Sequence, residues 1–190
     1  MKKTQSSGVS LTLLLTAMIC HSANPVDADD SRAGKPNVVL FLVDDMGWMD
    51  STPYGSKYYE TPNMKRLQTQ SMRFTDAYAT PLCSPTRAAI LTGKYPFKSG
   101  VSHVGWARER LSPKSLTIAE LLQATGYSTG IFGKWHLGDE ANYQPDKRGF
   151  AETFIHGSAL MMGKFGDAPG NDYFDPVILH NGKFETTSGY

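Results

Sequence analysis

The pattern of apolar and polar positions along the chain first predicts a buried strand. The segment Asn37–Val43 reads NVVLFLV and is almost continuously apolar and rich in valine. Such a run is typical of a strand buried on both faces, as in a parallel sheet with helices on either side. It ends in Asp44 and Asp45, followed by Met46 and Gly47. Carboxylates at the carboxyl end of a central strand lie where open α/β folds bind their ligands.

Two helices are predicted next along the chain from their boundary residues. Thr61 suits an N-cap, and Pro62 suits the first helical position. In the segment PTRAAILTG, Pro85 could begin a helix and Gly93 could end it. If Pro85 is the first helical residue, Cys83 lies just before the N-terminus of this helix.

The segment SLTIAELLQATG carries the clearest helix signal. Thr117 and Glu120 have the spacing of a capping box, and Gly126 is a stop signal at the other end. The residues that follow, YSTGIFGKWHLG, predict a strand that runs into a loop. Helix and strand in repeated succession predict an α/β sandwich with a mostly parallel central sheet flanked by helices.

Composition narrows the class of protein. The chain has 190 residues, enough for one domain with its own core, and a formal net charge of +1. This balance does not indicate a partner that is a nucleic acid or a membrane surface. Aromatic residues make up 11% of the chain, which together with many glycines and prolines favours a packed, loop-rich domain.

The N-terminus has the pattern of a secretory signal. A positive start precedes the apolar run Val9–Cys20, and Ala23 or Ala28 offers a cleavage position. The run is short for a membrane span, so no stable membrane insertion is expected, although a retained anchor is the alternative. We expect a signal peptide over residues 1–23, with cleavage as late as 28, and a periplasmic or secreted protein.

Downstream of this signal, residues 24–35 are polar and predict a linker, and residues 36–190 form the folded part. Cys20 is a poor lipoprotein site, because Ile19 is bulky. After cleavage Cys83 has no partner in the chain, in a compartment where cysteines usually pair. A buried structural thiol is the simplest interpretation of Cys83. Whether Cys83 has a function instead must be judged from the neighbouring residues.

Those neighbours suggest an anion site. The N-terminus of a helix favours negative charge near Cys83, and Arg87, one turn further on, adds a fixed positive charge. In an extended segment Lys134 and His136 point to one face, where they could hold an anion and move a proton. The alternatives are a core cysteine beside a surface arginine, and a solvated Lys/His pair.

The pair Asp44 and Asp45 suggests a metal site. Adjacent aspartates in a regular strand face opposite ways, so both can serve one site only if the strand breaks there, and the following Met46 and Gly47 allow this. Two hard carboxylate oxygens then suit calcium or magnesium. A polar strand end, or a cap for the next helix, is the alternative.

Three motifs in order carry a resemblance to a known family. They are PNVVLFLVDDMGW, the cysteine signature CSPTRAAILTG with its C-x-P-x-R pattern, and GYSTGIFGKWHLG. With these motifs the chain resembles the type I sulfatases, which have the alkaline-phosphatase-like fold, from about Pro36 onwards.

The resemblance implies a formylglycine, an aldehyde made from Cys83 by a dedicated maturation enzyme. Ser84, Pro85 and Arg87 would belong to the signal that this enzyme recognises. One hydroxyl of the hydrated aldehyde would attack the sulfur of a sulfate ester, and the second would expel sulfate and restore the aldehyde.

The resemblance also assigns roles to the other residues. Asp44 and Asp45, with the group derived from Cys83, would bind a divalent cation, usually calcium. The resemblance has Arg87 steady the hydrate and the metal site, Lys134 bridge hydrate and sulfate, and His136 assist sulfate elimination as a base. The substrate would be a sulfated small molecule or glycan.

The resemblance covers only an N-terminal portion of the family's domain. The further metal ligands and the groups that assist the leaving group have no match, so we expect a fold incomplete at its C-terminus and an inactive or weakly active chain. Lys98–Trp106 either lines the pocket, with His103 against the substrate, or is an ordinary loop. The alternative functions are a phosphonate monoester or phosphodiester hydrolase of the same superfamily, and a non-catalytic fragment.

Overall fold

We describe the protein from a computed structural model, for residues 34–156, 164–165, 168–169 and 174–189. The chain divides into two units, and the described residues belong almost entirely to the second, Val39–Tyr190. The predicted signal peptide lies outside the described residues, as does nearly all of the predicted linker. Within the described part, no helix has the length and apolar character needed to cross a membrane.

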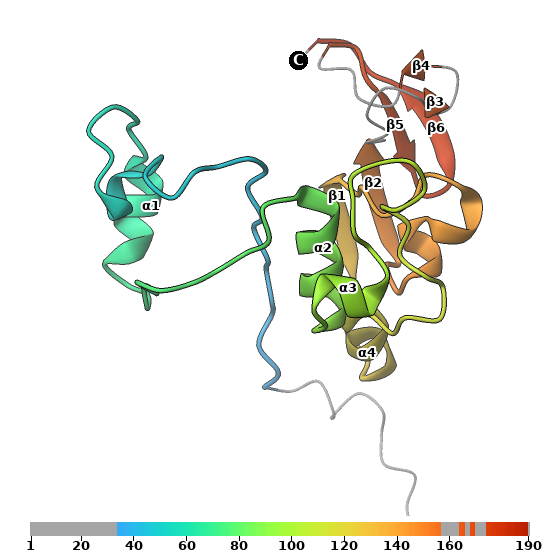
Figure 1. The fold of residues 1–190 in the computed structure, drawn as a ribbon, viewed down its shortest axis with the longest axis horizontal. Coiled ribbons are helices and arrows are strands. Elements are labelled where there is room, and N and C mark those ends of the chain that lie inside the picture. Colours follow the sequence, from blue (N-terminus) through green and yellow to red (C-terminus); the bar gives the residue numbers. More distant parts are fainter. Residues whose placement is uncertain (1–33, 157–163, 166–167, 170–173, 190) are drawn as a thin grey trace, which may run out of the picture. The chain divides into compact units, whose positions relative to one another are not determined.

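The second unit is organised around a four-stranded sheet in the order β1-β2-β5-β6 (Figure 1). Its strands are β1 (Gly130–Lys134), β2 (Glu152–His156), β5 (Val177–His180) and β6 (Lys183–Thr186). The short strands β3 (Lys164–Phe165) and β4 (Ala168–Pro169) pair with each other in a separate antiparallel ribbon.

This sheet is mixed rather than mostly parallel over the described residues. Strands β1 and β2 are parallel, whereas β2–β5 and β5–β6 are antiparallel. Asn181 and Gly182 connect β5 to β6, and both have positive φ, 47° and 81°. A two-residue Asn-Gly loop of this kind closes an antiparallel hairpin, which fixes the direction of the last two strands.

Each of the three segments with predicted helix boundaries is helical, and α3 is a further short helix. The helices are α1 (Pro62–Gln68), α2 (Cys83–Thr92), α3 (Pro96–Ser99) and α4 (Ile118–Ala124), with 3-10 turns η2 (Thr52–Tyr54), η3 (Ala141–Tyr143) and η4 (Pro145–Lys147). The capping box of α4 is confirmed, since Thr117 accepts from the Glu120 N–H and Glu120 accepts from the Thr117 N–H. Gly93 ends α2 in the left-handed conformation. The side chain of Thr61, by contrast, does not cap α1.

The predicted start of α2 was wrong by two residues. The helix begins at Cys83 rather than at Pro85, and Leu82 is the N-cap residue. Pro85 is accommodated in the first turn because the backbone nitrogens there have no partner within the helix in any case. Cys83 is therefore the first helical residue instead of lying just outside the helix.

The core joins α2 to one face of the sheet. It contains a cluster of buried apolar side chains from α2, the loops and strands β2 and β5: Ala88, Val101, Leu111, Trp135, Leu137, Ile155 and Leu179. Trp135 follows directly after β1, donates from its indole N–H to the Tyr143 carbonyl at 3.0 Å and meets Phe150 edge-on. Its burial anchors the segment that carries Lys134 and His136.

The predicted buried strand over Asn37–Val43 was wrong. These residues make no ladder in the described structure, and the apolar side chains of Val38–Val43 are 40–88% exposed. A strand of this composition is buried only when neighbours cover both its edges and its faces, and here β1 ends the described sheet without a further strand. The segment is instead fixed at its carboxyl end, where Asp44 is paired.

Candidate active site

The first pair of the site joins the start of α2 to the end of β1. The Sγ of Cys83 lies 3.2 Å from Nδ1 of His136. Helix α2 places Cys83 at its N-terminus, where unpaired backbone N–H groups favour an anion. His136 follows the last residue of β1 by two positions and has a left-handed backbone, with φ of 56°.

Hydrogen bonding defines the proton position on His136. Its Nε2 lies 3.0 Å from the carbonyl oxygen of Val104, which can only accept, so Nε2 carries the proton. The side chain is 1% exposed, and burial, with the nearby cations Lys134 and Arg87, lowers the pKa of His136 to about 4. The imidazole is therefore neutral at pH 7, and its unprotonated Nδ1 accepts a hydrogen bond from the Cys83 thiol.

A second group of charges centres on Asp44. One carboxylate oxygen lies 3.1 Å from a terminal nitrogen of Arg87, and the other lies 2.6 Å from Nζ of Lys134. Arg87 also donates to the backbone carbonyl of Lys134 at 2.5 Å. Partial burial raises the pKa of Asp44, but its hydrogen bonds to Lys134 and Arg87 outweigh that effect and keep the pKa below its ordinary value.

Part of this charged network borders an open cleft of about 400 Å³. Its lining includes Asp44, Asp45, Cys83 and Arg87. Asp45 has a left-handed φ of 56°, so the chain turns at the pair of aspartates instead of continuing as a strand. Both aspartates consequently border the same space as Cys83, which adjacent residues of a regular strand could not do.

The donor set fits a hard divalent cation in kind but only partly in number. Two carboxylates on one cleft are the oxygen ligands that calcium and magnesium prefer, yet calcium takes six to eight oxygens. Within the described residues, no group of three or more His, Cys, Asp or Glu side chains is arranged to hold a metal. Both oxygens of Asp44 are, moreover, engaged by cationic side chains.

The structure brings together the six residues assigned to the catalytic and metal sites from the sequence, although not always for the expected reason: Asp44, Asp45, Cys83, Arg87, Lys134 and His136. Lys134 and His136 do converge on the site, but β1 ends at Lys134, so the two-residue repeat of a strand does not explain it. The convergence is explained instead by the left-handed backbone conformation at His136. Sequence reasoning missed Val104, because a backbone carbonyl carries no residue-type signal.

Comparison with known proteins identifies the family. A model of the sulfatase family matches residues 36–182, so the chain belongs to the sulfatase family. The chain is 43% identical over 130 residues to the N-acetylgalactosamine-6-sulfatase of Sus scrofa, and the matched region covers 63% of this chain. It is 39% identical over 150 residues to the arylsulfatase G of Mus musculus, which spans 75% of this chain.

A solved structure supports the same fold. It is a protein in complex with its substrate D-glucosamine-2-N,6-O-disulfate, with a TM-score of 0.65 and 32% identity over 82% of this chain and 28% of that one. The α/β, alkaline-phosphatase-like class predicted from the sequence is therefore confirmed. The chain spans about a quarter of the length of the curated relatives, 25% and 28% of the two named above.

Proposed function

We propose that this chain carries part of the active site of a sulfuric ester hydrolase. The observation that supports this most directly is the geometry around Cys83, whose Sγ lies 3.2 Å from Nδ1 of His136 at the N-terminus of α2. Asp44, Arg87 and Lys134 form the adjoining charged network. Cations, helix N–H groups and a hydrogen-bonding imidazole together favour the binding of a tetrahedral anion such as the sulfate group of an ester.

In this proposal Cys83 is converted to formylglycine by a maturation enzyme. One hydroxyl of the hydrated aldehyde then attacks sulfur and displaces the alcohol, which leaves a sulfate ester on this residue. The second hydroxyl loses its proton as sulfate is eliminated, and the aldehyde is restored. Arg87 and Lys134 orient the oxygens around this residue and hold the sulfate by charge. His136, with Nε2 held by the Val104 carbonyl, offers Nδ1 as a proton acceptor beside the side chain at position 83.

Asp44 and Asp45 are the proposed ligands of a divalent cation, with the group derived from Cys83 as a third. Calcium is the preferred ion and magnesium the alternative, since both take carboxylate oxygens. Such an ion offsets the negative charge of the sulfate group when bound. The remaining oxygens would have to come from outside this set.

The proposed substrate class is a sulfated glycan or small molecule. Support comes from the relatives, one an N-acetylgalactosamine-6-sulfatase and another solved with a disulfated glucosamine. We propose further that residues 1–23 are a signal peptide, residues 24–35 a linker and residues 36–190 a portion of the catalytic domain. A periplasmic or secreted location then follows.

Mass spectrometry of the peptide that contains Cys83 tests the proposal directly. After coexpression with a maturation enzyme we expect the mass of an aldehyde in place of the thiol. The variant Arg87→Lys, which keeps the charge but breaks the C-x-P-x-R pattern, is expected to show less conversion. A thiol that remains fully unmodified in the unaltered chain would contradict the proposal.

A phosphodiester or phosphonate hydrolase is the second candidate, because both substrate types present a tetrahedral anion to the same cations. Parallel rates on 4-nitrophenyl sulfate and bis(4-nitrophenyl) phosphate separate the two activities. A chain that binds neither anion nor calcium would instead be the non-catalytic fragment considered above.

A further inference from the structure

The loop between α3 and α4 has a conformation that its sequence does not favour. At residues Gly105–Arg108 the backbone forms a tight turn, in which the Arg108 N–H donates to the Gly105 carbonyl at 3.2 Å. Its two central residues, Trp106 and Ala107, both have positive φ, 55° and 64°. Turns with two such residues favour glycine, asparagine or aspartate, and a bulky side chain there is an outlier.

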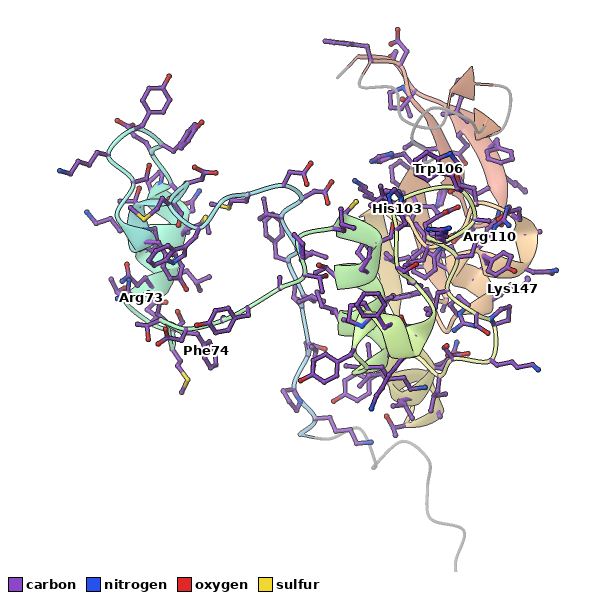
Figure 2. The ribbon with its side chains drawn as sticks, viewed as in Figure 1. Arg73, Phe74, His103, Trp106, Arg110 and Lys147 are labelled. Atoms are coloured by element: carbon purple, nitrogen blue, oxygen red, sulfur yellow. The ribbon has the colours of Figure 1, made fainter. Side chains whose placement is uncertain are left out.

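This unfavourable backbone presents an aromatic ring to solvent. Trp106 is 74% exposed, although tryptophan is mostly buried on average. Its ring centroid lies 4.9 Å from that of His103 (Figure 2). The Nδ1 of His103 is itself buried and has no hydrogen-bond partner within the described structure. A polar atom left in this state calls for a ligand group or a water to satisfy it.

The loop is also connected to the reacting centre. Val104 lies between His103 and Trp106 in sequence, and its carbonyl oxygen accepts the hydrogen bond from His136 that leaves Nδ1 free for Cys83. Trp106 is therefore only two residues away from the Val104 carbonyl, which orients the His136 ring. Arg108, two residues further on, is exposed and adds positive charge to the same turn.

From these observations we propose that Trp106 is a specificity-determining residue whose ring stacks on the sugar ring of a sulfated glycan. His103 lies beside it and supports the indole ring through the contact between the two rings. The apolar face of a pyranose matches the face of an indole, whereas inorganic sulfate has no surface for the ring to cover. This inference rests on the proposed function and names its substrate class.

Binding measured by calorimetry on the full chain tests the inference. The probes are glucosamine 6-sulfate, phenyl sulfate and inorganic sulfate, with the variants Trp106→Ala and Trp106→Tyr. Trp48→Ala is the matched control, because Trp48 is similarly exposed, at 69%, and lies outside the loop. Circular dichroism of each variant establishes that the fold is retained.

We expect Trp106→Ala to weaken glucosamine 6-sulfate binding by about tenfold. Binding of inorganic sulfate should stay unchanged, Trp106→Tyr should restore most of the loss, and Trp48→Ala should have no effect. Equal binding of glucosamine 6-sulfate by the unaltered chain and Trp106→Ala would overturn the inference and leave the anion site standing. A loss confined to phenyl sulfate would overturn the choice of a glycan. Failure of the unaltered chain to bind any of the three probes would overturn both the anion site and this inference.

Discussion

Lys134 Nζ lies 2.6 Å from Oδ2 of Asp44, although 90 residues separate the two along the chain. Arg87 occupies the other oxygen of the same carboxylate. A carboxylate has a limited number of lone-pair positions, so a divalent cation in the cleft competes with the ammonium group for Asp44. Occupancy by a metal and the position of Lys134 are therefore linked in the proposed site.

Asp44→Asn is expected to weaken calcium binding by at least about tenfold, because a charged ligand is replaced by a neutral one. Isothermal titration with calcium measures the effect. Asp146→Asn is the control, since Asp146 makes an ion pair with Lys147 outside the cleft lining. The ligand assignment would have to be abandoned if both variants bound calcium like the unaltered chain.

His136→Ala should lower the free energy of unfolding by about 2–3 kcal/mol, through the lost packing of a buried ring and an unpaired Val104 carbonyl. Urea unfolding followed by circular dichroism gives the value. His180→Ala provides a comparison, because His180 is much more exposed. A loss no larger than that of His180→Ala would contradict the described packing of His136.

Gly149→Ala tests a close backbone approach. A Cβ at position 149 would lie 2.3 Å from the backbone nitrogen of Glu120, and φ there is +86°. We expect destabilisation of about 3 kcal/mol, since neither strain nor clash can be relieved by a side-chain rotation. Gly105→Ala, which meets no atom within 4 Å, should be nearly neutral in the same thermal unfolding experiment. Equal melting temperatures for the two variants would argue against this packing.

His180 is expected to titrate above the ordinary histidine pKa of 6.5. Hydrogen bonds to Glu152 and then to Glu185 raise its pKa, because both carboxylates favour the imidazolium form. The pairing of His180 with these carboxylates therefore stabilises the fold fully below the pKa that His180 has in the unfolded chain. This stabilisation is lost as the pH rises through the raised pKa of the folded state. A titration followed by NMR measures the pKa directly. Glu152→Gln should lower it, and an unchanged value would refute the pairing.

Much of the local structure follows from sequence signals with a direct physical cause. The capping box at Thr117 and Glu120 and the stop at Gly93 were predicted because each satisfies backbone groups at a helix end. The convergence of Cys83, Asp44 and Lys134 was predicted from the three ordered motifs. These signals depend on residues close in sequence or on a family pattern.

What could not be predicted depends on long-range partners and on the backbone. The run Asn37–Val43 has the composition of a central strand, but composition does not supply the neighbouring strands that would bury it. The left-handed conformations of Asp45 and His136 are imposed by their surroundings, since neither residue type demands them. The contribution of the Val104 carbonyl is likewise invisible to any reading of side chains.

The exposed apolar run Val39–Val43 is expected to make the purified chain prone to aggregate. Val39–Val43 is uncharged, lacks proline and favours extended structure, which is the composition of segments that nucleate cross-β fibrils. Strand β1 ends the described sheet and so offers unpaired backbone groups as a template. Thioflavin T fluorescence of the purified chain is therefore expected to rise after a lag that shortens with concentration. Val39→Lys, a charge placed within the run, should lengthen that lag.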